Sequence, residues 1–450
     1  MWYSFFMRAF LIGFGIALGI GAVAAVTFFV APRFSLWPIA HTGADIAASA
    51  VERVKTKEEL IAEALERSKD VRGLYMTAEV ANDQGAGATR LRNRLIALAT
   101  STEINGMVID VKEVCGPEYN EKNLKKLLDT LHANNIWAIA RIVAFKDAGQ
   151  IYAHPDWYVH RTAAKYFADS CANKKHLRAK APEGTESATI FWQDNKGGYW
   201  LDPASDGARK YILGISKKMI DLGFDELQYD YVRFPSDGEV ARAVYPAWDG
   251  KSPKYAVMKS FFEFLNQNLK SYKPDIILSA DLFGYVAIRA GDVGIGQRLD
   301  DLGNNFDYIS FMVYPSHYYS GLYLPADTER KLPELKFNFS QARLHPDVVV
   351  QRSLQVARDF LDGRLASTSV ADIVHGTSTI AIENNPIPRS RARIRPWLED
   401  FFHDADKTAG RPFGIEKVRL QIEGAGHVEP HGWLLWNAAN IYTEGALKKE

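Results

Sequence analysis

From residue 71 onward, short apolar segments alternate with longer amphipathic ones, and this alternation constrains the fold more than any other feature. Segments of strand length, rich in β-branched and aromatic residues, are followed by stretches with helical periodicity. Such alternation is typical of a parallel sheet whose crossover connections are helices. Eight strands are expected, at residues 73–80, 106–112, 136–143, 227–234, 276–285, 308–317, 392–398 and 432–437.

Eight strands with helices between them, over about 370 residues, predict a (β/α)8 TIM barrel with long βα-loop insertions. The expected helices cover residues 89–99, 123–133, 206–222, 256–270, 346–361 and 415–424. An open doubly wound sheet is the alternative, but residues 82–87 lack the glycine spacing of a dinucleotide-binding loop. The long aromatic segment 146–202 is expected to form a flap over the mouth of the barrel.

Residues 9–30 form an almost uninterrupted apolar run between Arg8 and Arg33. A run of roughly 20 residues is long enough to cross a bilayer, so residues 1–35 are predicted to be a signal anchor. A cleaved signal peptide is the alternative, because Ala22-Val23-Ala24 has the small-x-small pattern of a cleavage site. Either reading predicts an exported protein, anchored to the bacterial cytoplasmic membrane and facing outward, or secreted or periplasmic. Residues 36–70 are expected to be a tether and lead-in helix, and residues 71–450 the barrel.

The charge balance and the cysteines narrow the function classes. A formal net charge of zero and a pI near 7.2 argue against nucleic-acid binding, which normally requires a basic excess. Only Cys115 and Cys171 are present, and both a disulfide and two free thiols remain open. No cofactor or metal is expected, because the sequence has neither a phosphate-binding loop nor a zinc-ligand pattern around His317.

An acid lies late in the predicted fourth strand, within the segment ELQYDYVRFP. Residues at the C-terminal end of a barrel strand point into the mouth where reactions occur, so Asp230 is the first catalytic candidate. Asp281 occupies the equivalent place in the fifth strand. Neighbouring strands lie ~5 Å apart, so these two carboxyl groups can flank one glycosidic bond, with Asp230 as nucleophile or base and Asp281 as acid. The alternative is that either aspartate caps a turn or pairs with Arg233.

Eight segments of the chain resemble one bacterial domain family of unknown function, labelled a "putative glycosyl hydrolase domain". They read GLYMTAEV, GMVIDVKE, YWLDPASDGARKYI, LGFDELQYDYVRFP, SADLFGYVA, DYISFMVYPSHY, IRPWLEDF and GWLLWNAANIY, in this order between residues 71 and 444. The resemblance implies a glycosidase-like TIM barrel. By analogy with barrel glycosidases that carry a nucleophilic aspartate at the end of the fourth strand, it also supports Asp230.

Other polar and aromatic residues near the ends of the predicted strands are candidates for substrate binding. They are Glu79, Asp110, Lys112, Arg141, Arg233, Tyr314, His317, Trp397, Asp400, Trp436 and Asn437. Glu79, Glu113 and Asp202 are alternative acids. A layer of structural salt links inside the barrel explains the charged members equally well.

The sequence therefore predicts a glycoside hydrolase that acts on a cell-envelope or extracellular polysaccharide, with the membrane contacted only through the N-terminal segment. The first alternative is a non-catalytic carbohydrate-binding or envelope-assembly protein on the same barrel. The second is a metal-dependent deacetylase or lyase, which would need a ligand cluster that the sequence lacks. The sequence does not separate a retaining from an inverting mechanism, because that choice depends on the distance between the two carboxyl groups.

Overall fold

The computed structural model describes residues 53–162, 167–180, 190–289, 292–366, 381–382, 390–429 and 431–449. The predicted anchor or signal at residues 1–35 lies outside the described residues. Among the helices that are described, none has the length and apolar character needed to span a bilayer.

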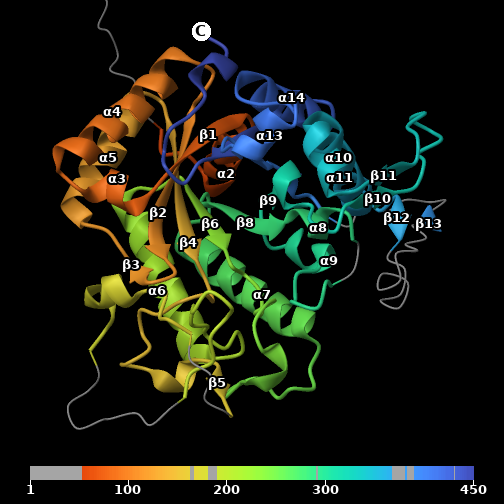
Figure 1. Ribbon diagram of the computed structural model, residues 1–450. Coiled ribbons are helices and arrows are strands. Elements are labelled where there is room, and N and C mark those ends of the chain that lie inside the picture. The colour runs from red at the N-terminus through yellow and green to blue at the C-terminus, as the bar shows by residue number, and fades with distance from the viewer. Residues whose placement is uncertain are drawn as a thin grey trace, which may run out of the picture. The chain divides into compact units, whose positions relative to one another are not determined.

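Parallel strands close into a barrel at the centre of the molecule (Figure 1). In order around the barrel they are β1 (Val71–Met76), β2 (Gly106–Glu113), β4 (Trp137–Val143), β6 (Glu226–Asp230), β8 (Ile277–Phe283), β9 (Tyr308–Met312), β14 with β15 (Arg393–Ile394 and Trp397–Glu399) and β16 (Gly432–Trp436). Because β1 pairs with both β2 and β16, the ring is closed. This confirms the predicted (β/α)8 barrel and excludes the open sheet.

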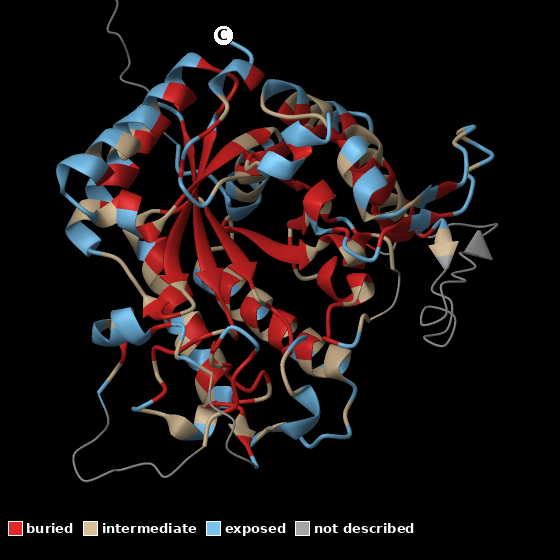
Figure 2. Cartoon of the chain, viewed as in Figure 1, coloured by how far each residue is buried: buried red, intermediate tan, exposed pale blue. Residues whose placement is uncertain are grey.

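The barrel strands are buried, and the helices around them expose one face to solvent (Figure 2). The helices are α2 (Lys57–Ser68), α3 (Ala78–Asn82), α4 (Ala86–Ser101), α5 (Glu121–Ala133), α6 (Asp206–Leu222), α7 (Lys254–Tyr272), α8 (Gly284–Ala287), α9 (Leu299–Leu302), α10 (Phe339–Leu344), α11 (Pro346–Leu361), α13 (Asp404–Thr408) and α14 (Ile415–Gly426). Outside the ring, short pairings join β2 to β3 (Gly116–Pro117), β5 (His160–Arg161) to β7 (Ala243–Val244), β10 (Leu322–Leu324) to β11 (Leu335–Phe337), and β12 (Leu365–Ala366) to β13 (Ala381–Ile382). Helices α6 and α11 begin and end at the predicted residues.

Several predicted strands run past the real strand ends. The first strand stops at Met76 because the side chain of Thr77 caps α3. The fourth stops at Asp230, where Tyr231 turns the chain with a positive φ of 52°. The sixth stops at Met312, before a short 3-10 turn that begins at Pro315. At the seventh position Pro396, which has no N–H to donate, separates β14 from β15.

The lead-in helix α2 closes the N-terminal end of the barrel. It begins with a capping box between Thr56 and Glu59, and its last residue is buried. There the Ser68 hydroxyl lies 3.0 Å from the Tyr308 hydroxyl, and Arg395 Nη2 donates to the Ser68 carbonyl at 2.8 Å. A helix therefore lies within the segment where the lead-in helix was expected, and it forms the floor of the barrel.

The segment 146–202 is attached at several points to the C-terminal side of the barrel. A disulfide joins Cys115, just after β2, to Cys171, with 5.5 Å between the Cα atoms, which resolves the choice that the sequence left open. Within the segment, Lys146, three residues after the end of β4, forms a 2.7 Å ion pair with Asp194. The buried ring of Trp200 lies 5.8 Å from that of Tyr231, so the segment packs on the residue that follows β6.

Candidate active site

Four carboxyl groups surround the guanidinium group of Arg141 at the C-terminal end of the barrel. Arg141 Nη1 donates to Asp110 Oδ1 at 2.6 Å and to Glu113 Oε1 at 2.5 Å, and Nη2 donates to Asp230 Oδ2 at 2.5 Å. Arg141 Nε lies 3.8 Å from Asp281 Oδ2. We call Asp110, Glu113, Asp230 and Asp281 the carboxylate cluster. The cluster brings together carboxyl groups from β2, β6 and β8 around the arginine side chain of β4.

Strand register explains why the two predicted catalytic aspartates lie together. Tyr229 on β6 pairs with Ala280 on β8, so the residues that follow them, Asp230 and Asp281, are neighbours on adjacent strands. Paired residues of parallel strands point to the same face of the sheet, here the barrel interior. The two aspartates thus lie on neighbouring strands, in the equivalent positions that the sequence indicated, and the structure places both beside the guanidinium group of Arg141. Their chemical roles stay a prediction.

The turn after β6 holds the Asp230 carboxylate in position. Asp230 Oδ1 accepts a hydrogen bond from the backbone N–H of Tyr231 at 2.6 Å, while Oδ2 is bound by Arg141. Tyr231 adopts the left-handed backbone region, which is unfavourable for a bulky residue and recurs at functional sites. Both carboxylate oxygens thus have a fixed donor.

The pKa values of Asp281 and Glu113 are shifted in opposite directions. Burial raises the pKa of Asp281 well above its usual value, and the nearby Asp230 carboxylate raises it further. The Trp397 indole N–H donates to Asp281 Oδ1 at 2.7 Å, and Arg141 Nε lies 3.8 Å from Oδ2. Burial also acts to raise the pKa of Glu113, but the ion pair with Arg141 outweighs it and the pKa is lowered. The cluster therefore combines a proton-holding acid with an ionised one.

Replacing Asp281 by asparagine is expected to change how stability depends on pH. Because the folded-state pKa of Asp281 is raised, the folded protein binds the proton more tightly than the unfolded chain, and stability falls as pH rises from about 4 through the raised pKa. The asparagine side chain cannot ionise and keeps the acceptor for Trp397. Asp281→Asn should be more stable than the wild type at pH 8, by on the order of 1 kcal/mol, and lose this advantage near pH 4. Urea unfolding across this range tests it. The exposed Asp156→Asn is the control, and identical pH profiles for Asp281→Asn and the wild type would refute the prediction.

Three aromatic candidates lie beside the cluster. Burial, then Asp281 and Asp230, raise the pKa of the buried Tyr314. Trp436 is partly exposed, with its ring centroid 6.0 Å from that of Tyr75. Trp397 is buried, and its indole N–H is a hydrogen-bond donor to Asp281.

Three predicted site residues point elsewhere. A register shift in β2 between Asp110 and Lys112 turns Lys112 away from the cluster, and its ammonium group binds Asp147 at 2.8 Å. Glu79 is exposed on α3, not at a strand end. Arg233 packs over the Trp200 and Phe283 rings, and Arg141 takes the predicted ion pair with Asp230.

The remaining candidates connect loops at the edge of the site. Asp400 is buried and accepts hydrogen bonds from the N–H and hydroxyl of Thr443 at 2.8 and 2.6 Å, and burial raises its pKa to about 6. Asn437 donates to the Asp400 carbonyl at 2.5 Å. The alternative acid Asp202 accepts hydrogen bonds from three backbone N–H groups, those of Ala204, Ala247 and Trp248. His317 is exposed and lies 3.1 Å from the Ser316 hydroxyl through Nδ1.

Sequence reasoning missed Tyr75 and ranked Glu113 too low. The Tyr75 hydroxyl donates to Asp110 Oδ2, so it belongs to the cluster. Its position just before the end of β1 resembles that of an ordinary core residue, and no pattern distinguishes it. Glu113 turns toward Arg141 only because of the register shift in β2, which the sequence does not display.

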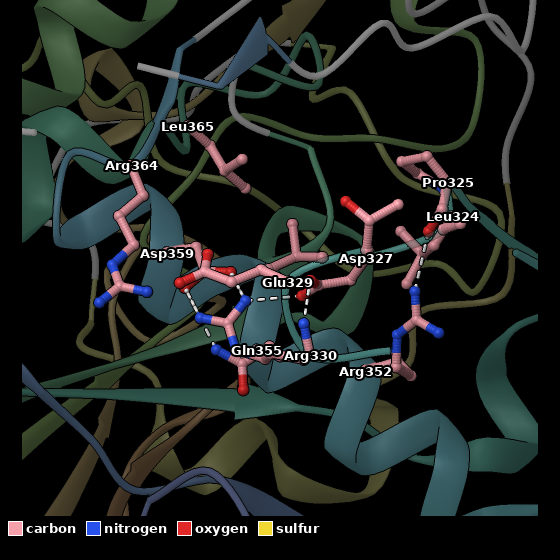
Figure 3. Close-up of a pocket in the computed structure, with 13 residues that line it drawn as sticks. Leu324, Pro325, Asp327, Glu329, Arg330, Arg352, Gln355, Asp359, Arg364 and Leu365 are labelled. Carbon is pink, nitrogen blue, oxygen red and sulfur yellow. Dashed lines mark hydrogen bonds and ion pairs between the residues drawn. The ribbon is translucent and has the colours of Figure 1, made fainter. Parts of the chain in front are cut away.

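A hollow of about 180 Å³ lies beside α11, apart from the residues of the carboxylate cluster (Figure 3). Its Arg330 bridges Asp327 at 2.6 Å and Asp359 at 2.7 Å, and Arg352 donates to the carbonyl groups of Pro325 and Pro333. These charged groups attach the loop after β10 to the helix, and no cluster residue lines the hollow. In the part of the chain that the structure describes, no three or more His, Cys, Asp or Glu side chains are placed so that they could hold a metal ion together.

Comparisons with known proteins identify a family for this chain and several similar structures. A family model described as "Putative glycosyl hydrolase domain" matches residues 73–442. A hypothetical protein from Ruminiclostridium thermocellum is 27% identical, over 46% of this chain and 96% of that one, with a TM-score of 0.34. The PgaB (BpsB) glycoside hydrolase domain from Bordetella bronchiseptica is 11% identical, over 82% and 95%, with a TM-score of 0.48. The α-amylase from H. orenii is 11% identical, over 82% and 68%, with a TM-score of 0.41. No curated protein sequence matches significantly.

Proposed function

The chain belongs to the family described as "Putative glycosyl hydrolase domain", and from this premise we propose that it hydrolyses glycosidic bonds in a polysaccharide. The observation that carries the proposal is the pair Asp230 and Asp281 on adjacent strands, at one guanidinium group and at the end of the barrel where reactions occur. Glycoside hydrolysis requires two carboxyl groups that flank the bond.

The surroundings of the two aspartates differ in a way that suits the two roles of the reaction, a charged carboxylate and a proton donor. Asp230 has a fixed donor on each oxygen and Arg141 as counter-charge, so it is the nucleophile or the base that activates water. Asp281 retains its proton to higher pH because it is buried beside another acid, so it protonates the departing oxygen. Arg141 positions both groups and balances the charge of the cluster.

The proposed substrate is a cell-envelope or extracellular polysaccharide. Support for an exported protein comes from the apolar run at residues 9–30 and from the Cys115–Cys171 disulfide, since disulfides persist mainly in oxidising compartments. The N-terminal run would keep the barrel at the outer face of the membrane, where such polymers lie.

The test is release of reducing ends from a panel of bacterial polysaccharides by purified full-length protein. The wild type should cleave at least one polymer, and Asp281→Asn should lose most activity on the acidic and neutral side of the pH profile, where Asp281 of the wild type holds its proton. The alkaline fall of the wild-type profile that reflects loss of this proton should be absent in the variant. A polymer that is bound tightly but never cleaved would instead favour the non-catalytic carbohydrate-binding alternative. Chelator-sensitive release of acetate would favour the metal-dependent one.

A further inference from the structure

A continuous row of aromatic rings begins beside the carboxylate cluster. The Tyr75 ring, whose hydroxyl binds Asp110, lies next to that of Trp436. The Trp436 centroid is 6.2 Å from that of Tyr314 and 5.3 Å from that of Phe401. Tyr75 and Tyr314 are buried, whereas Trp436 and Phe401 are partly exposed. In the inner part of the row, Trp436 and Phe401 are therefore accessible to a ligand, and Tyr75 and Tyr314 support them from the protein interior.

The row continues outward over the loop that follows β9. The His317 ring lies 5.9 Å from Phe401 and 5.7 Å from Tyr319. Tyr319 in turn lies 5.3 Å from Phe339 at the start of α10. Tyr319 is 66% exposed, the largest exposure of any tyrosine among the described residues. The row thus leads from the cluster to solvent.

The backbone on both sides of the outer row is fixed. Arg343 of α10 forms a 2.7 Å ion pair with Asp406 of α13, and Arg411 donates to the Ser340 hydroxyl at 2.6 Å. Helices α10 and α13 accordingly lie in the same region of Figure 1. A rigid support suits a binding surface, because little order is lost when a ligand settles on it.

The chemistry of the row fits sugar rings without charge. Aromatic rings present flat apolar faces, and burying them against the C–H face of a pyranose removes apolar surface from water. The cation beneath the row, Lys417, is buried and paired with Glu399 at 2.5 Å, so it is not available to a ligand anion. A single exposed aromatic residue is ordinary, but a row that ends at the reacting groups is not.

We propose that this row binds successive units of a neutral glycan chain, with Trp436 nearest the scissile bond and Tyr319, beside Phe339, at the far end. The inference rests on the proposed function and deepens it, because it makes the polysaccharide an uncharged one and assigns the residues that hold its chain. Units stacked on Tyr319 hold a long chain in place, whereas a disaccharide at the cluster does not reach it.

Affinity electrophoresis tests the proposal without requiring turnover. Purified full-length protein in mild detergent is run through native gels that contain hydroxyethyl cellulose, glycol chitin or soluble starch. For the polymer that retards the wild type, Tyr319→Ala should weaken binding about five- to tenfold, and Tyr319→Phe, which keeps the ring, should stay within about twofold. The matched control is Tyr272→Ala, an exposed tyrosine on the outer helix α7.

The outcomes separate this inference from the proposed function. If the wild type and Tyr319→Ala are retarded equally, the proposed glycan-binding role of the row is refuted. The absence of retardation in all three gels refutes it as well. If binding depends on Tyr319 but no polymer is cleaved, the glycan-binding role of the row is supported and the proposed hydrolase activity is refuted. If Tyr319→Ala and the wild type cleave the polymer at the same rate, and a disaccharide at the same rate, the proposed role of the row is wrong. The proposed hydrolase activity is then still supported.

Discussion

Replacing Asp230 by asparagine is expected to lower kcat/KM for polysaccharide cleavage by about 1000-fold or more. Asparagine has the same size and keeps an oxygen for Arg141 or for the Tyr231 N–H, so the barrel should still fold. It lacks the negative charge needed to attack the anomeric carbon or to activate water. A factor of ~1000 corresponds to about 4 kcal/mol in the barrier. Initial rates of reducing-end release, with circular dichroism to verify folding, measure the effect.

Glu113→Gln is the matched control for this experiment. Glu113 also binds Arg141 and is the more exposed of the two carboxylates, but it lies on β2, away from the register pair. Its loss should reduce activity by about tenfold or less, because Arg141 keeps its other partners. If Asp230→Asn retains more than a tenth of the wild-type rate while Glu113→Gln is inactive, Glu113 carries the role and our assignment is wrong.

The fold was largely predictable from the sequence because alternating strands and helices leave few architectures. Strand ends were less predictable. Residues such as Thr77 and Gly284 continue an apolar pattern but begin helices, since a capping side chain or a flexible residue decides where the chain turns. The split at Pro396 was visible in principle, because proline cannot donate to a neighbouring strand.

The site was predictable where the strand period decides direction. Asp110, Arg141, Asp230 and Asp281 lie late in β-strands with regular pairing, and all four meet. Prediction failed at Lys112 because a register shift reverses the direction of every later side chain in the strand. Contacts between residues distant in sequence, such as that from Trp397 to Asp281, leave no trace in local patterns.

The inward positions of β6 show how the barrel combines stability and function. Glu226, Gln228 and Asp230 follow one another at the period of a strand, from the floor of the barrel to its mouth. Gln228 donates to the Ser310 hydroxyl at 3.3 Å in the middle layer. Glu226 is fully buried in the floor, as is its partner Arg395. One strand thus carries a structural ion pair at one end and the candidate nucleophile at the other.

Replacing Arg395 by methionine is expected to destabilise the protein by about 3–5 kcal/mol, the largest stability effect among our predictions. Arg395 Nη1 donates to both oxygens of Glu226, at 2.9 and 2.8 Å, and Nη2 binds the Ser68 carbonyl of α2. Without Arg395, Glu226 would be a buried carboxylate that keeps the Trp137 indole N–H as a donor, at 3.0 Å, but has lost its counter-charge. Urea unfolding of both proteins, followed by tryptophan fluorescence, measures the loss.

The double variant Arg395→Met with Glu226→Gln separates two contributions to the loss of stability, the unpaired charge of Glu226 and the lost packing of Arg395. The glutamine side chain can still accept from the Trp137 indole N–H but carries no charge, so the double variant should recover more than half of the loss. No recovery would mean that the Ser68 contact and the stacking of Arg395 on Tyr308, 3.8 Å from the ring centroid, supply most of the stability. A loss below about 1 kcal/mol for Arg395→Met alone would show that the floor tolerates an unpaired acid by protonating it, and the ion pair would then be dispensable.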